Sequence, residues 1–299
     1  MKVLMITGDR RFGPGYPRYD LQKSVVDDLA VVYLGRSAPW QKIPAERFDV
    51  VTAQDPFWRG LFAWRAARRI GARLNIQVHT SVLNPLGKFV LRRADSVRVV
   101  SERIKKQVEA AGVRAPITVL PVYVDISKFR NIVRQPFDVA QGKPHNQKTM
   151  LWIGRFETEK DPLLALGVLE AVRQEGVDTR LVMLGKGSLE KSLHARVRGL
   201  PVEFPGWQDP VPYLAVADVV LSTSKHESYG ASTIEALAAG VPVVSPDVGV
   251  AREAGAVVAA RQDLAHAVAE VLRNSGKGEL KIQPLNEQEW AAQWKQSLM

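Results

Sequence analysis

Two glutamates in the second half of the sequence are spaced to bind the hydroxyl groups of a ligand. Glu227 follows the apolar run Asp218–Ser222, and Glu235 lies in a predicted helix after seven intervening residues. Gly230, between them, permits a tight turn at the start of that helix. A helix N-terminus favours phosphate through its free N–H groups and dipole, and carboxylates accept charge-assisted hydrogen bonds from hydroxyls. The segment predicts a site for a phosphate, a sugar and a ribose.

A second segment with similar chemistry runs from Trp152 to Pro162. An apolar strand ends at Gly154, and the next helix opens with Asp161 as its predicted N-cap and Pro162 at its first position. Arg155 and Lys160 flank the intervening loop. Two cations beside a helix terminus can neutralise a diphosphate without a metal. The segment Leu184–Ser188 repeats the strand–Gly–helix pattern, which alone is a common connector.

Strands and helices that could position these residues alternate along both halves of the chain. Predicted strands are Val3–Thr7, Val31–Leu34, Val50–Thr52, Leu74–Val78, Ser96–Val100, Ile117–Leu120, Thr149–Ile153, Arg180–Leu184, Val202–Phe204, Val219–Ser222, Val241–Ser245 and Val257–Ala259. Predicted helices are Leu21–Leu29, Trp58–Ile70, Leu86–Arg93, Glu102–Ala110, Pro162–Gln174, Leu189–Val197, Ala231–Ala239 and Leu264–Arg273. Such alternation favours parallel sheets that are covered on both faces.

The segment Val133–Lys148 separates the two halves, since it has no helix or strand period and is rich in Pro, Gly, Gln and Asn. The C-terminal stretch Glu287–Leu298 has Trp290 and Trp294 on one helix face, a pattern typical of packing. The sequence therefore predicts two doubly wound, Rossmann-like α/β domains, whose ligand site lies in a cleft at the carboxyl ends of both sheets. The predicted parts are a first domain 1–130, a linker 131–148, a second domain 149–280 and a docking helix 281–299.

Composition and length limit the classes of protein that this chain can be. Its 299 residues suit two domains, and the lack of cysteine excludes disulfides, a thiolate nucleophile and cysteine-bound metals. No apolar run reaches the ~18 residues of a membrane-spanning helix, and the apolar start of the chain is too short for a signal peptide. We therefore expect a cytoplasmic protein.

The positive charge is concentrated in one part of the sequence. The net charge is +10, and residues 59–114 contain 13 Lys or Arg against three acids. Aromatic residues lie within this segment or directly before it, among them Trp58, Trp64 and Phe89. Two interpretations stay open at this stage: solvated basic helices, or a surface that contacts an anionic partner. Basic helices with exposed aromatics suit an acidic membrane surface, whereas no motif for nucleic-acid binding is present.

Together, these motifs resemble the retaining glycosyltransferases of family 4, which have the two-domain GT-B fold. The Glu-x7-Glu pattern matches Glu227 and Glu235, and the Gly-Arg…Lys loop matches Gly154, Arg155 and Lys160. In the first half, segments 76–80, 93–102 and 120–129 resemble the family's histidine-bearing strand, its Ala-Asp…Val-Ser strand and its interdomain linker.

The resemblance implies a role for each matching residue. Arg155 and Lys160 would stabilise the diphosphate leaving group, Glu235 would bind the ribose, and Glu227 would bind the sugar of the donor. His79, from the other domain, would contact the donor sugar near the reacting centre. The remaining implied donor contacts are backbone groups at Ser228, Tyr229 and Gly230 for the phosphate and sugar, Gly185, Gly187, Phe204 and Gly206 for the base, and Gly13 or Gly15 for the phosphates.

The resemblance also implies the reaction and its partners. A sugar would pass from a nucleotide-diphosphate donor to a glycan or lipid-linked acceptor with retention of configuration, without a cofactor or an essential metal. Independently of the resemblance, the cations and aromatics of segment 59–114 predict peripheral contact with an acidic membrane surface, and no nucleic-acid partner is expected. Two alternatives stay open. One is a nucleotide-sugar epimerase of the same fold, and the other is a non-catalytic member that binds nucleotide-sugars or polyanions.

Overall fold

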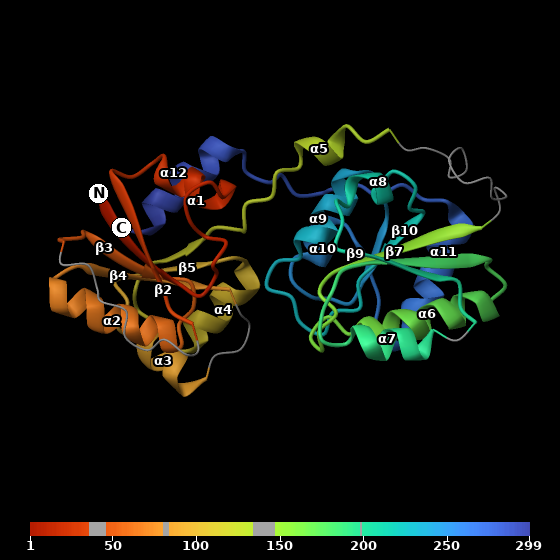
Figure 1. The fold of residues 1–299 in the computed structure, drawn as a ribbon, viewed down its shortest axis with the longest axis horizontal. Coiled ribbons are helices and arrows are strands. Elements are labelled where there is room, and N and C mark those ends of the chain that lie inside the picture. Colours follow the sequence, from red (N-terminus) through yellow and green to blue (C-terminus); the bar gives the residue numbers. More distant parts are fainter. Residues whose placement is uncertain (36–45, 80–83, 134–146, 198) are drawn as a thin grey trace. The chain divides into compact units, whose positions relative to one another are not determined.

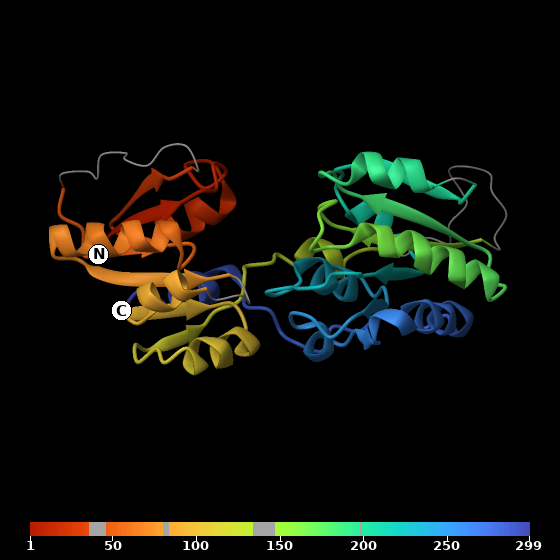
Figure 2. The same ribbon diagram turned by 90° about the horizontal axis from the view of Figure 1, so that it is seen from below.

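The computed structural model describes residues 1–35, 46–79, 84–133, 147–197 and 199–299 (Figure 1). The chain forms two compact units. Unit 1 comprises Met1–Tyr123 together with Leu285–Met299, and unit 2 comprises Val124–Pro284. Each unit is a parallel sheet with helices on both faces, as the views in Figures 1 and 2 show. The predicted doubly wound α/β architecture is therefore confirmed.

Unit 1 is built on a six-stranded sheet in the order β2-β1-β3-β4-β5-β6. The first strand in sequence, β1, pairs in parallel with β2 on one side and β3 on the other, so that Met5 lies opposite both Val31 and Thr52. The strands are β1 (Lys2–Thr7), β2 (Asp28–Tyr33), β3 (Val50–Ala53), β4 (Arg73–Val78), β5 (Ser96–Val99) and β6 (Ile117–Val119).

Helices cover both faces of this sheet. They are α1 (Pro17–Lys23), α2 (Trp58–Ile70), α3 (Pro85–Leu91), α4 (Glu102–Ala110) and α12 (Glu287–Ser297). Helices α1 and α12 lie on one face, and α2, α3 and α4 lie on the other (Figure 1). Because side chains alternate along a strand, Val3 and Met5 face the first pair of helices and form a buried cluster with Tyr19 and Trp294.

The C-terminal helix α12 docks onto unit 1 through the two tryptophans that the sequence places on one face. Trp290 and Trp294 are both buried, and Trp290 donates from Nε1 to the carbonyl of Pro121 at 2.8 Å. The helix begins with a capping box formed by Asn286 and Glu289. The predicted packing role of the tryptophans is confirmed.

The predicted helix Leu21–Leu29 is wrong. The helix is α1, which starts at Pro17 and ends at Lys23, and the chain turns before β2 begins at Asp28. Leu29 pairs with Val3 in the sheet instead. Leu29 thus belongs to a strand and Val25 and Val26 to the turn before it, because pairing along β1 overrides the local helical spacing.

Unit 2 is built on a second six-stranded parallel sheet, in the order β12-β11-β10-β7-β8-β9. Chain order reverses between β7 and β10, which are neighbours in the sheet. The strands are β7 (Lys148–Ile153), β8 (Thr179–Leu184), β9 (Val202–Gly206), β10 (Val219–Leu221), β11 (Val243–Ser245) and β12 (Val257–Val258).

The helices of unit 2 also form two layers. They are α5 (Ser127–Arg130), α6 (Pro162–Gln174), α7 (Glu190–Arg196), α8 (Val211–Leu214), α9 (Ala231–Ala238), α10 (Ala251–Ala254), the 3-10 turn η1 (Arg261–Asp263) and α11 (Leu264–Asn274). One buried cluster joins Met150 and Trp152 to α6 and α11, whereas Leu151 and Val182 pack with α5, α8, α9 and α10 on the opposite face.

The unit boundary falls earlier than the predicted end of the first domain at residue 130. Phe129, on α5, is buried in a core cluster of unit 2 beside Leu151 and Leu237. Residues 124–130 therefore belong to unit 2, because burial of this phenylalanine ties them to its core. Residues 134–146, most of the predicted linker, lie outside the described residues.

Candidate functional site

Several predicted donor residues of unit 2 lie in the loops that follow two neighbouring strands of its sheet. In open α/β sheets, ligands bind outside the carboxyl ends of the strands where chain order reverses. In this sheet the chain order reverses between β7 and β10, so the expected position is at the carboxyl ends of these two neighbouring strands. The loop after β7 contains Gly154, Arg155 and Lys160, and the loop after β10 contains Glu227 and leads into α9.

Lys160 and Glu227 form a direct ion pair between these two loops. Their side chains are only 21% and 15% exposed. Ser224 donates from its hydroxyl to the same Glu227 oxygen at 2.8 Å. A cation and a carboxylate are thus held together at the switch point, where one can bind a phosphate and the other a sugar hydroxyl.

Arg155 is not part of this pair. Its side chain is 65% exposed and forms an ion pair of 2.7 Å with Glu159, four residues later in the same loop. An exposed pair of this kind contributes little to stability, on the order of 0.2–1 kcal/mol. The guanidinium can therefore turn toward a bound phosphate at small cost. The structure brings Lys160, and not Arg155, to Glu227.

The start of α9 supplies uncapped N–H groups beside Glu227. Gly230 occupies the N-cap position with φ of +100°, a conformation that favours glycine. No side chain caps the helix, so its first N–H groups can receive an anion. The preceding Tyr229 is buried, and burial raises its pKa to about 12. Ser228 is half-buried in the same loop.

Glu235 lies on the second turn of α9 and is half-buried. Burial raises the pKa of its carboxyl to about 7, with Lys128 lowering it and Asp209 raising it. The Lys128 ammonium and the Asp209 carboxylate lie 3.6 Å apart. A carboxyl that titrates near neutrality in this way is typical of functional sites.

The glycines after β8 have a structural explanation. A side chain at Gly185 would collide with the carbonyl of Gly154, since its Cβ would lie 1.8 Å from that oxygen. A Cβ at Gly187 would lie 2.5 Å from the carbonyl oxygen of Phe156. These glycines let the loop after β8 lie against the loop after β7. Their predicted contact with a nucleotide base stays a prediction.

Phe204 and Gly206 belong to β9, the strand at one edge of the same sheet. Phe204 packs edge-on against Phe156, with ring centroids 6.2 Å apart, and against His194 at 4.5 Å. Gly206 accepts a hydrogen bond from the N–H of Gly185 at 2.9 Å. Gly206 thus contacts the glycine loop directly, whereas Phe204 contacts Phe156, whose backbone lies against Gly187.

The predicted residues of unit 1 lie after its own strands. His79 follows β4 and is half-buried, and burial together with the charges of Arg98 and Arg18 lowers its pKa to about 3. Gly13 is buried under the hydroxyl of Tyr33, which would lie 2.6 Å from a Cβ there.

Gly15 lies in the same loop and is exposed with φ of +83°. Its N–H donates to the Asp20 carboxylate at 3.2 Å. Of the two glycines predicted to approach phosphates, Gly15 is thus the one whose surface is open.

Three residues that organise this site were not predicted from the sequence. Thr223 is fully buried, and its hydroxyl lies 2.9 Å from the carbonyls of both Lys160 and Asp161. Trp152 donates to that hydroxyl from Nε1, also at 2.9 Å. Arg261 reaches Asp161 from η1. These three residues belong to no recognisable sequence motif. Their roles become visible only from their contacts in the folded structure.

Asp161 stands at the predicted N-cap position of α6, but its side chain does not cap the helix. The carboxylate instead pairs with Arg261 at 2.5 Å and with Lys225 at 3.6 Å. The prediction of Pro162 at the first helical position is confirmed.

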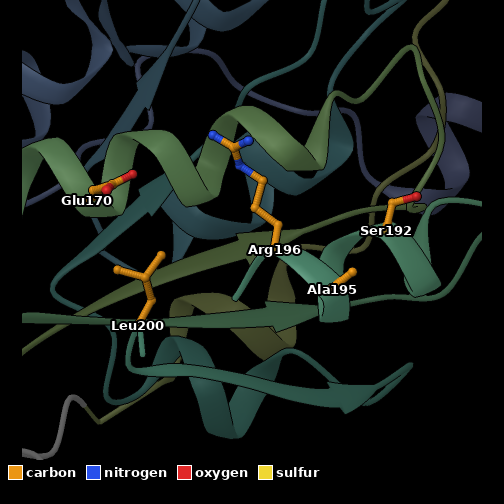
Figure 3. Close-up of a pocket in the computed structure, with 5 residues that line it drawn as sticks. All are labelled: Glu170, Ser192, Ala195, Arg196 and Leu200. Carbon is orange, nitrogen blue, oxygen red and sulfur yellow. The ribbon is translucent and has the colours of Figure 1, made fainter. Parts of the chain in front are cut away.

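A hollow of about 460 Å³ lies between α6 and α7. It is lined by Glu170, Ser192, Ala195, Arg196 and Leu200, which Figure 3 shows. It contains none of the predicted site residues.

Within the described ranges, no three His, Asp or Glu side chains gather as possible metal ligands. Among the described helices, none is long and apolar enough to cross a bilayer.

Two Rossmann-like units, each a parallel sheet covered by helices on both faces, define a two-domain α/β protein of the GT-B fold. The family model described as "Glycosyl transferases group 1" matches residues 147–274, and the one described as "Glycosyltransferase Family 4" matches residues 15–128. The chain belongs to the group 1 glycosyltransferases of family 4.

Curated relatives agree with this family. A GDP-mannose-dependent alpha-(1-6)-phosphatidylinositol dimannoside mannosyltransferase of Mycobacterium tuberculosis is 31% identical over 158 residues, which are 50% of this chain and 40% of the relative. An N-acetyl-alpha-D-glucosaminyl L-malate synthase of Bacillus anthracis is 25% identical over 254 residues, covering 78% of this chain and 62% of the relative. The chain thus spans about half the length of these relatives.

Solved structures share the fold along the whole chain. HepE from Anabaena, in complex with UDP and glucose, has a TM-score of 0.72 at 18% identity, covering 100% of this chain and 99% of that one. Sucrose-phosphate synthase from Thermosynechococcus elongatus has a TM-score of 0.69 at 15% identity, covering 100% of this chain and 96% of that one. At this identity, the similarity establishes the GT-B fold.

Proposed function

We propose that this chain transfers a sugar from a nucleotide-diphosphate donor to an acceptor, with retention of the anomeric configuration. The observation that carries the proposal is the contact between Lys160 and Glu227 beside the uncapped start of α9. A cation and free N–H groups suit a diphosphate, and the neighbouring carboxylate suits a sugar.

Each donor group has a partner in this scheme. Lys160, the N–H groups that follow Gly230, and Arg155 bind the diphosphate. Glu227 accepts hydrogen bonds from the hydroxyls of the donor sugar, and Ser224 keeps its carboxylate oriented. Glu235 accepts hydrogen bonds from the ribose.

The chemical step needs stabilisation of the leaving group. The bond from the anomeric carbon to the diphosphate oxygen breaks, and its electron pair stays on that oxygen. The acceptor hydroxyl attacks from the same face and gives its proton to the leaving phosphate. Lys160 and the start of α9 stabilise the negative charge as it forms. No side-chain nucleophile and no metal is required by this scheme.

We propose that His79 of unit 1 binds a sugar hydroxyl, and that unit 1 provides the surface for the acceptor. With its pKa lowered to about 3, the imidazole is neutral at pH 7. It can therefore donate one hydrogen bond and accept another. A neutral ring suits a sugar hydroxyl.

The test of the transferase proposal joins binding and product analysis. A thermal-shift screen over nucleotide-diphosphate sugars identifies the donor, because a ligand that binds only the folded state raises the melting temperature. Glu227→Ala should abolish turnover, while Glu270→Ala, which removes an exposed glutamate of α11, keeps it. Unchanged turnover in Glu227→Ala would refute the assigned role.

Product analysis separates the alternatives. An epimerase converts the donor alone, whereas a transferase forms a new glycoside only with an acceptor present. A non-catalytic member would bind a nucleotide-sugar without converting it. The matching loops after β7 and β10 favour the transferase.

We further propose that unit 1 contacts an acidic membrane surface through α2 and α3. The exposed cations of these helices and the turn after them form a basic surface that consists of Arg65, Arg68, Arg69, Lys88, Arg92 and Arg93. Trp58 and Phe89 are 61% and 38% exposed beside them. Exposed aromatics among cations suit the headgroup region of a bilayer.

The basic surface contains a hollow built around Trp64. The guanidinium carbons of Arg68 and Arg93 lie 5.5 and 5.6 Å from its ring centre, and Phe89 packs edge-on at 5.6 Å. The hollow measures about 530 Å³. Two guanidiniums beside an aromatic ring suit a lipid phosphate.

Not every cation of residues 59–114 belongs to this surface. Arg98 is buried and donates to Gln77, Leu120 and Pro121. Arg59 pairs with Asp55 at 2.6 Å. The basic surface is therefore narrower than the charged segment in the sequence.

A lipid-linked acceptor fits a membrane-bound unit 1. Two relatives have a lipid in their names, phosphatidylinositol dimannoside in one and monoglucosyldiacylglycerol in the other. We propose a glycan or lipid-linked acceptor and a cytoplasmic location at the inner face of a membrane. Nucleic acid is not among the proposed partners.

A further inference from the structure

The residue after Lys160 has an unusual backbone conformation. Asp161 has φ of 47° and ψ of 58°, in the left-handed region. Among the described residues other than glycine, only Ser275 shares a positive φ. The following Pro162 disfavours the right-handed helical region for residue 161. Residue 161 is left with extended or left-handed conformations, and some interaction must select between them.

Arg261 supplies an interaction that holds the left-handed conformation. One guanidinium nitrogen donates to the Asp161 carboxylate at 2.5 Å, and the other donates to the carbonyl of Thr223, also at 2.5 Å. Thr223 stands at the start of the loop that bears Glu227. The planar fork of arginine thus joins both loops of the site from a third element, η1.

The joined loops leave little freedom to the backbone of Lys160. Its carbonyl lies 2.9 Å from the Thr223 hydroxyl, and the N–H of Lys225 donates to the carbonyl of Glu159 at 2.8 Å. A change of conformation at Asp161 would redirect the chain on which Lys160 is mounted. The ammonium would then leave the Glu227 carboxylate.

We propose that Arg261 is a positioning residue that locks Asp161 in the left-handed conformation and so places the Lys160 ammonium for the diphosphate. Arg261 itself touches no proposed donor group. The inference rests on the proposed function, because it assigns the ammonium of Lys160 to the donor. It also explains why an aspartate at an N-cap position does not cap its helix.

A double-mutant cycle tests the lock, because glycine adopts the left-handed conformation without help. The variants are Arg261→Ala, Asp161→Gly and both together, with Arg252→Ala as the control. Arg252 forms an exposed ion pair with Asp247 in the same unit. Measured quantities are the melting temperature, kcat, and KM for the nucleotide-sugar found in the thermal-shift screen.

We expect Arg261→Ala to raise KM for the donor about tenfold and to lower the melting temperature. In the Asp161→Gly background, the same substitution should change KM less than twofold. Arg261→Lys, which keeps the charge but loses the fork, should lie in between. Equal effects of Arg261→Ala in both backgrounds, or an unchanged KM in the single variant, would overturn the inference.

The two proposals fail in different ways. If no nucleotide-sugar raises the melting temperature of the wild-type chain, the proposed function fails. The melting temperatures then still test whether Arg261 holds Asp161 in the left-handed conformation. Additive losses from Arg261→Ala and Asp161→Gly overturn it, and a smaller loss in the glycine background supports it.

Discussion

The ammonium of Lys160 contacts the carboxylate of Glu227 across 67 positions of sequence. The two residues come from loops that follow neighbouring strands of one parallel sheet. Each loop alone is an ordinary strand-to-helix connection. Their contact creates a site in which a positive and a negative group stand side by side, half withdrawn from water.

Removing Lys160 should damage both binding and stability. Lys160→Met leaves the Glu227 carboxylate partly buried without its cation, and we expect a loss of about 1–3 kcal/mol in the free energy of unfolding. Turnover should fall at least 100-fold, since the charge on the leaving diphosphate loses its main partner. Urea unfolding and initial rates measure the two effects.

The double variant Lys160→Met with Glu227→Gln separates these effects. It removes both charges, so we expect it to regain most of the lost stability but none of the turnover. Recovery of turnover would contradict the assigned roles.

Glu235 should make stability depend on pH. Its carboxyl pKa is raised from 4.5 to about 7 in the folded state, so the folded chain binds a proton that the unfolded chain releases between these values. The free energy of unfolding therefore falls as pH rises from 4.5 to 7, as far as this group contributes. Glu235→Gln should remove that part of the dependence and be more stable than wild type at pH 8, as urea unfolding at several pH values would show.

Donor binding should depend on the same group in the opposite direction. The ionised carboxylate is the better acceptor for ribose hydroxyls, so affinity for the donor should rise as pH increases through 7. Calorimetric titration at pH 6 and 8 measures this change. A wild-type affinity that is equal at both values would contradict the role given to Glu235.

His79 should stay neutral throughout the physiological range. Burial and two nearby arginines lower its pKa to about 3, so the folded chain does not bind the proton that an unfolded histidine binds below about 6.5. Its contribution to stability is lost as pH falls from 6.5 toward 3. The ring signals in an NMR titration, assigned with His79→Gln, should not shift from pH 5 to 8. A sigmoidal shift centred between 6 and 7 would show that the imidazole titrates normally.

Trp294 should carry much of the attachment of α12 to unit 1. Its side chain is fully buried among Val3, Met5 and Leu298. Truncation to alanine should destabilise unit 1 by about 3–5 kcal/mol, while the exposed control Gln296→Ala should change little. Calorimetry should show an earlier transition for unit 1, and nucleotide binding by unit 2 should persist. Loss of nucleotide binding together with that transition would show that the two units do not melt independently.

The basic surface should determine binding to acidic vesicles. Arg68→Glu with Arg93→Glu replaces both guanidiniums of the Trp64 hollow, and we expect flotation with phosphatidylglycerol vesicles to fall at least fivefold. The matched control reverses two exposed cations of unit 2, Lys191 and Arg196, and should float like wild type. High salt should weaken wild-type binding, because screening reduces attraction between exposed charges. Equal flotation of both double variants, or wild-type binding to phosphatidylcholine alone, would contradict the proposal.

The sequence alone determined the architecture and the main residues of the candidate site. Alternating apolar strands and helices are local patterns, so helices such as Trp58–Ile70 and Pro162–Gln174 have their predicted bounds. Glycines, prolines and charged groups at strand ends marked the loops after β7 and β10, because a turn and an anion site each need particular residue types.

The tertiary structure decided which of these residues meet. Helix 21–29 failed as a prediction because strand pairing with β1 outweighed a local period. Arg155 and Lys160 look alike in sequence, yet only Lys160 reaches Glu227. Arg261 stands 100 positions from Asp161, and a contact of that range depends on how strands and loops pack. Charge and secondary-structure propensity depend on the local sequence. Contacts between side chains that are distant in sequence form only after the sheet has brought them together.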